Sequence, residues 1–214
     1  MMRNVLIVFC KYPIAGKVKT RLAADIGADQ ACKLYRIMCE EIFRLCNIVQ
    51  IERQCTICIY IDDVAYMNDI SVWTQHKFTY SVQQGITLGD RLYHACADEF
   101  LNKKSDKVVI IGTDSPMLSS KIIYEAFDAL DTFDYVIGPT LDGGYHTIGM
   151  TNIDSNIFQG ISWSTEIVNS QTQEMINNYG KSIKLLETLP DIDTYEDLNI
   201  LHDKYPQIYD KLFQ

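Results

Sequence analysis

The stretch Lys107-Val-Val-Ile-Ile-Gly-Thr-Asp-Ser-Pro-Met-Leu118 decides the fold. Its four β-branched residues from Val108 to Ile111 show no alternation of apolar and polar side chains. Such a run is typical of a strand buried on both faces, as in a parallel sheet with helices on each side. The turn that follows places Asp114 at the carboxyl end of this strand, the edge at which open α/β sheets bind ligands. Asp114 is therefore a candidate metal ligand, and a helix-cap or Asx-turn role is the alternative.

Strand and helix patterns alternate along the rest of the chain and indicate a three-layer α/β/α, Rossmann-like domain with a mixed, mostly parallel sheet. Strands are predicted at 4–10, 54–61, 77–82, 107–112, 135–139 and 183–186, with an edge strand at 147–150. Helices are predicted at 28–47, 89–102, 120–130 after Ser119, up to about 179 after a Ser164 or Thr165 cap, and at 194–204 after a Thr194–Asp197 capping box. We expect a single domain over 1–214, in which 140–163 is a candidate subdomain that covers the site.

The net charge of -9 excludes a general nucleic-acid or anionic-membrane binder, because such proteins need a positive field. A small anionic substrate held by a few local cations stays compatible with this charge. No apolar run approaches the roughly 20 residues that a membrane span needs. The N-terminal residues are typical of a first strand rather than a signal peptide, so we expect a cytoplasmic protein. The sequence leaves the oligomeric state open.

The cysteines favour a structural role over a metal or redox role. Cys32, Cys39 and Cys46 lie seven residues apart on a predicted helix, so they share one face and are expected to be buried apolar side chains. Cys55 and Cys58 resemble a zinc or redox pair, but residues three apart on a strand point to opposite faces.

A basic loop follows the first strand, with Lys11, Lys17, Lys19 and Arg21 around Gly16. Cations and backbone amides in this position suit a phosphate group. Neither the P-loop pattern nor GxGxxG is present, so those two nucleotide motifs are not supported. The alternative is a solvated basic loop, which is less favoured in so acidic a chain.

Asp193 follows the strand predicted at 183–186 and can reach the same sheet edge as Asp114. Two carboxylates from separate strand ends, completed by substrate phosphates, would suit Mg²⁺. The alternative is that Asp193 interacts with the N-terminus of its own helix. Gly143 and Gly144 would allow a close approach of the backbone to a ligand or form a tight turn, and Asp142 could contact a sugar hydroxyl or the acceptor.

Six motifs occur in one order, and together they resemble the bacterial DUF2064 family of small GT-A-like glycosyltransferase proteins. That family is often described as a radical-SAM- or selenoprotein-associated transferase. The chain is similar more distantly to phospholactate guanylyltransferase and the molybdenum-cofactor cytidylyltransferases. The motifs are Phe9-x-Lys11-x-Pro13-x-x-Gly16-x-Val18-Lys19-Thr20-Arg21-Leu22, Leu88-Gly89-Asp90-Arg91, Ile111-Gly112-Thr113-Asp114-Ser115-Pro116, Gly138-Pro139-x-x-Asp142-Gly143-Gly144-Tyr145-x-x-Ile148-Gly149, Trp163-Ser164-Thr165-Glu166 and Asp191-Ile192-Asp193-Thr194-x-x-Asp197-Leu198.

The resemblance implies a nucleotide-diphospho-sugar transferase (GT-A) fold and a set of roles at the matching positions. Asp114 and Asp193 would bind Mg²⁺ or Mn²⁺. The nucleotide and its phosphates would lie against Lys11, Gly16, Lys17, Lys19, Arg21, Gly89 and Asp90. Lys19, Arg21 and Asp142 would act in catalysis, and Gly143, Gly144, Tyr145 and Trp163 would hold the acceptor. His146 and Cys10 depart from the family pattern. Because of His146, the family pattern does not define the acceptor pocket of this chain.

By a narrow margin, this resemblance favours a metal-dependent nucleotide-diphospho-sugar transferase. Its substrates would be a nucleotide or nucleotide-sugar donor and a small-molecule acceptor, without nucleic acid. One alternative is a nucleotidyltransferase that joins an NTP to a phosphorylated acceptor and releases pyrophosphate. A second alternative is a non-catalytic nucleotide-sugar-binding module, against which the two intact carboxylates argue.

Overall fold

The computed structural model describes residues 3–213, without the side chains of residues 211 and 212, and its core is one seven-stranded sheet. The strands are β1 (Asn4–Cys10), β2 (Thr56–Ile61), β3 (Thr79–Val82), β4 (Lys107–Ile111), β5 (Tyr135–Pro139), β6 (Tyr145–Met150) and β7 (Ile183–Leu185). Their order across the sheet is β3-β2-β1-β4-β6-β5-β7. Only β6 runs antiparallel to its neighbours, so the mixed, mostly parallel sheet predicted from the sequence is confirmed.

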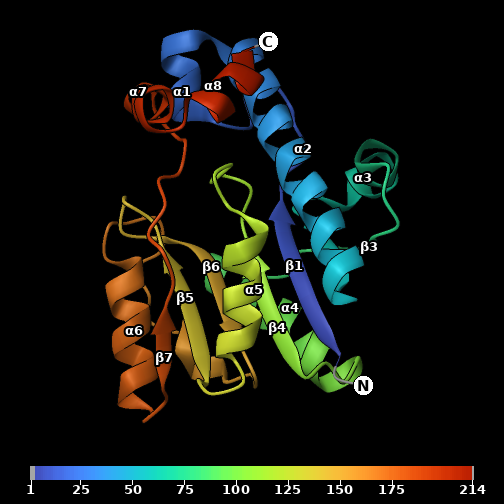
Figure 1. The fold of residues 1–214 in the computed structure, drawn as a ribbon, viewed down its shortest axis with the longest axis vertical. Helices are drawn as coiled ribbons and strands as arrows, with labels where there is room; N and C mark the ends of the chain where they lie inside the picture. Colours follow the sequence, from blue (N-terminus) through green and yellow to red (C-terminus); the bar gives the residue numbers. More distant parts are fainter. Residues whose placement is uncertain (1–2, 214) are drawn as a thin grey trace.

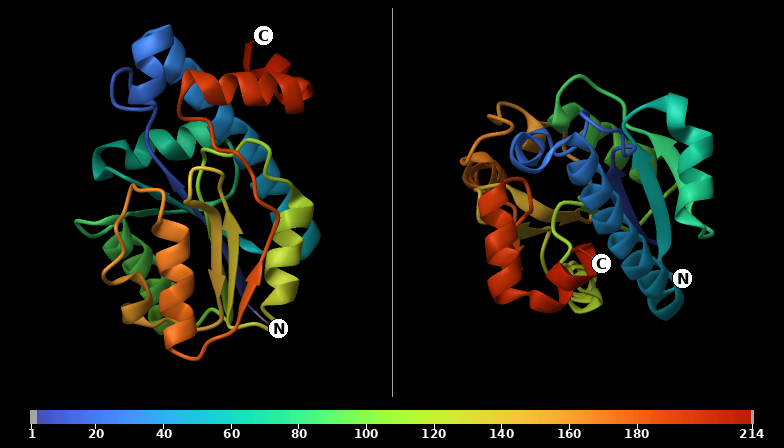
Figure 2. Two further views of the ribbon diagram at one scale, coloured as in Figure 1. Left: turned by 90° about the vertical axis from the view of Figure 1, so that its left-hand side faces the viewer. Right: turned by 90° about the horizontal axis from the view of Figure 1, so that it is seen from above.

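Helices cover both faces of the sheet and form the outer two layers. They are α1 (Thr20–Ile26), α2 (Ala28–Arg53), α3 (Met67–Thr74), α4 (Leu88–Ala97), α5 (Ser120–Ala129), α6 (Val168–Asn178), α7 (Tyr195–Lys204) and α8 (Pro206–Phe213), with short helical turns at Val64–Tyr66, Asp98–Asn102 and Ser155–Phe158. Buried side chains of α2 and α5 pack in one core cluster, and those of α4 and α6 pack in the other. Figure 1 shows β1 running toward the end of the molecule where α1, α7 and α8 gather, and Figure 2 shows the same grouping from two further sides.

Strand β4 is central because every one of its residues is buried. Val108 and Ile110 face the cluster under α4 and α6, whereas Val109 and Ile111 face the cluster under α2 and α5. An uninterrupted β-branched run is what a strand covered on both faces requires. The stretch from which the fold was predicted therefore has the predicted environment.

The strand predicted at the sheet edge is wrong in its position. Residues 147–150 belong to β6, which lies between β4 and β5. An inner position is possible because the polar side chains of β6 are buried and paired, with His146 Nδ1 2.8 Å from Thr147 Oγ1. Gly149 also leaves space that the side chains of Val109 and Val136 fill. Because 140–163 contributes β6 to the sheet, any covering role of this segment concerns its remaining residues and stays a prediction.

Three helix predictions also need correction. The predicted cap at Ser164 or Thr165 is wrong, because α6 begins at Val168 after Ile167, without a side-chain cap. Helix α2 begins at Ala28, as predicted, but it continues to Arg53, past the predicted end at residue 47. Helix α8 was not predicted, and it begins at Pro206, because proline is well tolerated in the first turn of a helix.

The predicted caps at Ser119 and at Thr194–Asp197 are confirmed by their hydrogen bonds. The expected separation of Cys55 and Cys58 is confirmed too, since each thiol lies in a different core cluster. Within residues 3–213, no helix is both long enough and apolar enough to cross a membrane.

We predict that Gly138→Ala destabilises the protein by about 1–3 kcal/mol, because an added methyl group in a packed core forces its neighbours to move. A Cβ at Gly138 would lie 2.2 Å from the His146 ring. Urea unfolding would measure the loss. Gly112→Ala is the matched control, since a Cβ there meets no atom within 4 Å. Equal losses in the two variants would contradict this account of Gly138.

Candidate active site

The candidate site is a cleft formed by two adjoining cavities of about 540 and 550 Å³ at the carboxyl ends of β1 and β4. Both cavities have Asp114 and Asp193 in their walls, so these carboxylates stand at the junction. The first cavity is called the basic half below, and the second the acidic half. Parallel strands with their crossovers leave such a crevice at this edge, which is where α/β folds bind ligands.

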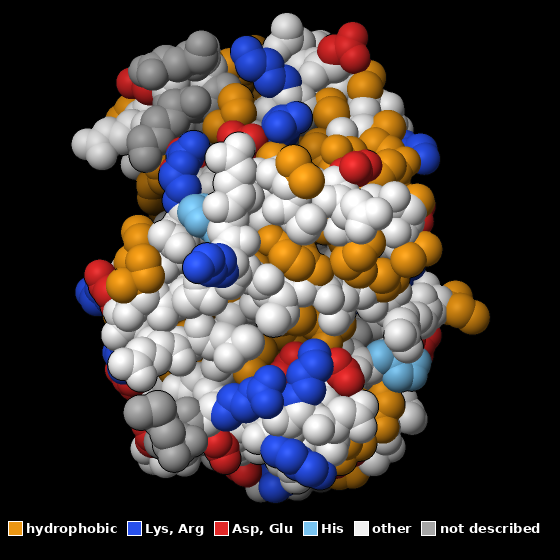
Figure 3. Space-filling view, turned by 90° about the vertical axis from the view of Figure 1, so that its right-hand side faces the viewer, with side chains coloured by type: hydrophobic (Ala, Val, Ile, Leu, Met, Phe, Trp, Pro, Cys, Tyr) orange, Lys and Arg blue, Asp and Glu red, His pale blue; other side chains and the backbone are white. Residues whose placement is uncertain are grey.

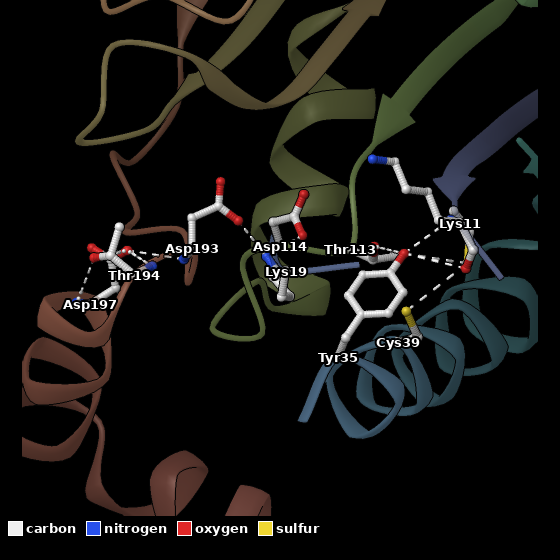
Figure 4. A network of polar contacts seen from close by, with 10 residues as sticks. Lys11, Lys19, Tyr35, Cys39, Thr113, Asp114, Asp193, Thr194 and Asp197 are labelled. Carbon is white, nitrogen blue, oxygen red and sulfur yellow. Dashed lines mark hydrogen bonds and ion pairs between the residues drawn. The ribbon is translucent and has the colours of Figure 1, made fainter. Parts of the chain in front are cut away.

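An ammonium group joins the two carboxylates at the junction. Lys19 Nζ lies 2.5 Å from Asp114 Oδ1 and 2.7 Å from Asp193 Oδ1. The Lys19 side chain is 2% exposed, whereas those of Asp114 and Asp193 are 49% and 40% exposed. Figure 4 shows the lysine between the two aspartates, whose second oxygens point to one side, away from it. One cation thus connects segments that follow three different strands.

Backbone hydrogen bonds fix the positions of both aspartates. The amide of Ile192 donates to the carbonyl of Asp114 over 2.9 Å, which holds the two segments side by side. Asp197 Oδ2 accepts from the amides of Asp193 and Thr194, at 2.9 and 2.7 Å. The capping box that starts α7 therefore also orients Asp193, so this aspartate does not itself cap the helix.

Lys19 adopts a left-handed backbone conformation, with φ 48° and ψ 45°, directly before α1. This conformation is uncommon for a residue with a side chain and is often found at functional sites. Here it turns the lysine back toward the sheet, where it meets the carboxylates.

Neighbouring charges and burial have opposite effects on the pKa values of Lys19 and Asp193. Burial disfavours the charge on Lys19, but Asp114 and Asp193 outweigh it and hold the pKa of the ammonium above its usual value. Burial likewise disfavours charge on Asp193, yet Lys19, Arg21 and Lys11 together lower the pKa of this carboxyl. The attraction of these three cations outweighs burial, so the carboxylate stays ionised.

Tyr35, on helix α2, holds the start of the basic loop in place. Its hydroxyl accepts from the amide of Lys11 over 2.9 Å and lies 3.1 Å from Thr113 Oγ1 (Figure 4). The phenol is buried, and burial raises its pKa, so it stays neutral. Tyr35 thereby holds the end of β1 against the end of β4, next to Asp114.

The basic half contains cations from two segments. Lys11 and Lys19 come from the loop after β1, and Arg91 comes from α4. Arg91 is oriented by Gln83 Oε1 at 3.4 Å and by the carbonyl of Gly85 at 3.2 Å. Of the predicted nucleotide-binding residues, Lys11 and Lys19 line this half.

The other predicted nucleotide-binding residues have different surroundings. Gly16 and Lys17 lie in the same loop but not in the wall of either cavity. Gly89 lies against Trp163, where a Cβ would be 2.9 Å from the indole nitrogen. Asp90 completes a capping box with Thr87 at the start of α4. Gly89 and Asp90 therefore shape the cleft through packing and capping.

The acidic half contains the predicted acceptor and catalytic residues except Lys19, which lines the basic half, and Gly143. Its wall includes Arg21, Asp142, Gly144, Tyr145 and Trp163. Gly143 lies outside the wall because it packs against a neighbouring loop, where a Cβ would lie 1.9 Å from the carbonyl oxygen of Glu166. With φ at +89°, this position also favours glycine conformationally.

Asp142 is held in place by its own turn. Its Oδ1 accepts from Thr140 Oγ1 at 2.5 Å and from the amide of Gly144 at 3.0 Å. Its Oδ2 remains for a ligand on the exposed side of the residue. The carboxylate is thus oriented before any substrate binds.

His146, which departs from the family pattern, is a packed structural residue. It is 5% exposed, and its two ring nitrogens lie 2.8 Å from Thr147 Oγ1 and 3.0 Å from the carbonyl of Glu187. Burial lowers the pKa of the imidazole, so it stays neutral at physiological pH. His146 therefore holds β6 against the segment after β7.

Sequence reasoning did not assign a role to three charged residues of the cleft. They are Arg91 in the basic half, and Glu166 and Asp191 in the acidic half. All three belong to motifs that had been recognised, so a signal for them was present. Burial, followed by Asp142 and Asp193, raises the pKa of Asp191 from 3.8 to about 7.

The donor set at the junction fits a hard divalent cation. Two carboxylate oxygens face the same side (Figure 4), and Mg²⁺ commonly takes one or two carboxylates and completes its shell with phosphates and water. Among residues 3–213, no group of three acidic, histidine or cysteine side chains is arranged to hold a metal ion. A metal here would therefore depend on oxygen atoms from its substrate.

The outer surface differs from the cleft. Figure 3 shows the face on the right-hand side of Figure 1, where acidic, basic and hydrophobic side chains are interspersed. Lys and Arg side chains gather near its lower end, close to acidic ones.

A family model matches residues 48–165, more than half of the chain, and its description is an uncharacterised protein family conserved in bacteria, DUF2064. The chain belongs to this family. The resemblance predicted from the six motifs is thereby confirmed. A search of curated proteins gives no match.

Solved structures support the same fold. A crystal structure from Desulfovibrio desulfuricans G20, provisionally assigned as a nucleotide-diphospho-sugar transferase, is 30% identical and has a TM-score of 0.87. The match covers 95% of this chain and 88% of that chain. Inositol-1-phosphate CTP transferase from T. maritima is 12% identical, with a TM-score of 0.57 over 99% and 96% of the two chains. CMP:2-keto-3-deoxy-manno-octonic acid synthetase complexed with CTP is 11% identical, with a TM-score of 0.56 over 96% and 99%.

We predict that Asp191→Asn stabilises the protein at neutral and alkaline pH. The folded state raises the pKa of Asp191 to about 7 from 3.8, so it binds this proton more tightly than the unfolded state does. The contribution of Asp191 to wild-type stability should therefore fall as pH rises between about 4 and about 7, and the variant lacks this loss, so the variant should gain stability relative to wild type over this range. Melting temperatures across this range would measure the difference.

Asp25→Asn, on the exposed side of α1, is the matched control. A difference between Asp191→Asn and wild type that stays constant with pH would contradict the account of Asp191.

Proposed function

We propose that the chain is a metal-dependent transferase that moves a sugar from a nucleotide-diphosphate donor to a small-molecule acceptor. The observation that carries this proposal is one cleft with a basic half and an acidic half, which meet at Asp114 and Asp193. A donor diphosphate needs cations, whereas a neutral hydroxyl acceptor needs carboxylates or other hydrogen-bond acceptors. The family membership and the similarity to a nucleotide-diphospho-sugar transferase support the same assignment.

The donor would bind in the basic half. Lys11 and Arg91 would contact its phosphates from opposite segments, and Gln83 lies beside Arg91 in the same wall. Asp114 and Asp193 would hold Mg²⁺ or Mn²⁺, which supplies charge neutralisation for the diphosphate. Lys19 keeps these two carboxylates at a fixed separation in readiness for the donor. Positioned charges of this kind are the main source of catalysis in phosphate chemistry.

The acceptor would bind in the acidic half, where Asp142 is oriented by Thr140 and Gly144. In the reaction, the acceptor hydroxyl oxygen forms a bond with the anomeric carbon of the donor sugar. The bond from that carbon to the phosphate oxygen breaks, and the nucleoside diphosphate leaves with the electron pair. The hydroxyl proton passes to the carboxylate of Asp142, which acts as general base. Arg21, in the same wall, would offset charge on the departing phosphate.

The charge of the acidic half favours sugar transfer over nucleotidyl transfer. A nucleotidyltransferase of the predicted type would place a negatively charged, phosphorylated acceptor in this half. Among the described residues of the wall, Arg21 is the one Lys or Arg that could bind its phosphate. Like charges at close range disfavour that arrangement. A binding module without turnover has no need for a carboxylate oriented toward the acceptor, so it is the less favoured alternative.

We predict that a nucleotide-diphospho-sugar raises the melting temperature in the presence of Mn²⁺, and that Asp114→Asn removes the metal-dependent part of the shift. A ligand about 100-fold above its Kd stabilises a protein by about 2.7 kcal/mol. A thermal-shift panel of NTPs and nucleotide-diphospho-sugars, followed by measurement of released nucleoside diphosphate, tests this. Asp63→Asn is the control, because Asp63 caps a short helical turn outside the cleft.

No metal-dependent shift with any nucleotide would contradict both transferase assignments. Pyrophosphate release from an NTP and a sugar phosphate would instead support nucleotidyl transfer.

We predict that Lys11→Gln weakens donor binding about tenfold, because it removes one charge-assisted hydrogen bond to phosphate. Lys17→Gln makes the same change six residues along the loop, outside the cleft wall. From the sequence motif, both variants should weaken donor binding. From the geometry of the cleft, only Lys11→Gln should weaken it. Calorimetric titration with a nucleoside diphosphate and Mn²⁺ would separate the two expectations, and Lys121→Gln on α5 controls for loss of charge.

A further inference from the structure

The acidic half contains three carboxylates that lack a cation partner. Asp142, Glu166 and Asp191 line it together with Asp114 and Asp193. Lys19 pairs with Asp114 and Asp193. Within residues 3–213, no lysine, arginine or histidine forms an ion pair with the other three. Arg21 lies in the same wall, and Asp191 is partly protonated at neutral pH, so the excess negative charge of this cavity of about 550 Å³ rests mainly on Asp142 and Glu166.

The hydrogen-bonding groups of this wall point to a ligand that is rich in donors. The hydroxyl of Thr140 donates to Asp142, and that of Thr165 donates to the carbonyl of Ser162. These two hydroxyl protons are committed within the protein. The wall also includes other hydroxyl-bearing residues, Ser115, Ser164 and Tyr145. Each of their hydroxyl groups can accept as well as donate, so the carboxylates set the charge of the ligand that fits. A protonated amine is the chemical group that supplies several donors, no acceptor and a positive charge.

Trp163 adds a second recognition element. Its indole lines the acidic half, and its edge is fixed by contact with Gly89. The face of an indole attracts cations, and such a contact adds to the attraction of nearby carboxylates. Aromatic faces with carboxylates are a common arrangement for binding organic cations, whereas a phosphorylated ligand would be repelled.

We infer that the acceptor of this transferase is a small hydroxylated molecule with a protonated amino group, held in the acidic half by Asp142, Glu166 and Asp191 against Trp163. This inference rests on the proposed function, which assigns the acidic half to the acceptor. The amino group binds the carboxylates, and a separate hydroxyl group is the nucleophile. The two halves of the cleft then select substrates of opposite charge, which prevents the donor from binding in the acceptor half.

The test uses the fluorescence of Trp163 in a Trp73→Phe protein, in which Trp163 is the remaining tryptophan of the two. Matched probes differ in charge: glucosamine, N-acetylglucosamine and glucose 6-phosphate, and, without a sugar ring, 1,3-diamino-2-propanol and glycerol. We expect each amine to bind at least about tenfold more tightly than its neutral counterpart, and the phosphate ester to bind most weakly. Added salt should weaken binding of the amines, because it screens the attraction.

The double variant Asp142→Asn, Glu166→Gln should reduce the preference for amines to near unity. The Asp142→Asn change is not expected to disturb the turn, because an amide oxygen can still accept from Thr140 and Gly144. The control is the double variant Asp69→Asn, Glu125→Gln, which makes the same chemical changes on α3 and α5, outside the acidic half, and should keep the preference.

Equal binding of neutral or phosphorylated probes would overturn the inference, as would a preference that survives the double variant. The absence of amine binding at about 10 mM would overturn it as well. Nucleotide binding, measured by thermal shift on the same protein, separates the two proposals. If nucleotides bind with metal but amines are not preferred, the acceptor class is wrong and the proposed function stands, whereas the loss of nucleotide binding contradicts the proposed function.

Discussion

The ammonium group of Lys19 between Asp114 and Asp193 is the interaction on which the rest of the cleft depends. It joins the loop after β1, the turn after β4 and the segment before α7 at one point. The left-handed conformation of Lys19 costs about 1–3 kcal/mol. Each ion pair at this range contributes several kcal/mol of attraction at an effective dielectric constant of about 20, before desolvation is counted. Solvent around the two half-exposed carboxylates screens part of this attraction, and burial of the ammonium opposes it, but the two pairs together offset the cost of the strained residue.

Buried hydrogen bonds prepare the partners of Lys19 independently of the charges. Tyr35 positions the start of the basic loop against Thr113, and the amide of Ile192 donates to Asp114. The capping box of α7 orients Asp193 through its amide. The two carboxylates therefore meet the ammonium in a preformed geometry, in which little side-chain freedom remains to be lost.

The division of charge across the cleft follows from this junction. The sequence of the first loop suggested a single basic site, but the backbone turn at Lys19 separates its cations. Lys11 faces one half, Arg21 faces the other, and Lys17 faces neither. The carboxylates after β5 and β7 then dominate the second half. A chain of net charge -9 can thus hold a polyanionic donor in one half of a cleft, because local rather than total charge decides binding over these distances.

By itself, the sequence determined the layered fold, the central place of β4 and the sheet edge at which the site forms, because apolar periodicity and turn residues are local signals. It also brought Asp114, Asp193 and the basic loop to that edge, since parallel strands share their carboxyl ends. Only the tertiary structure decided that β6 is an inner strand, that Lys19 stands between the aspartates, and that Asp191 lies close enough to Asp142 to raise its pKa. Those facts depend on distances between residues far apart in the chain, which a linear pattern does not encode.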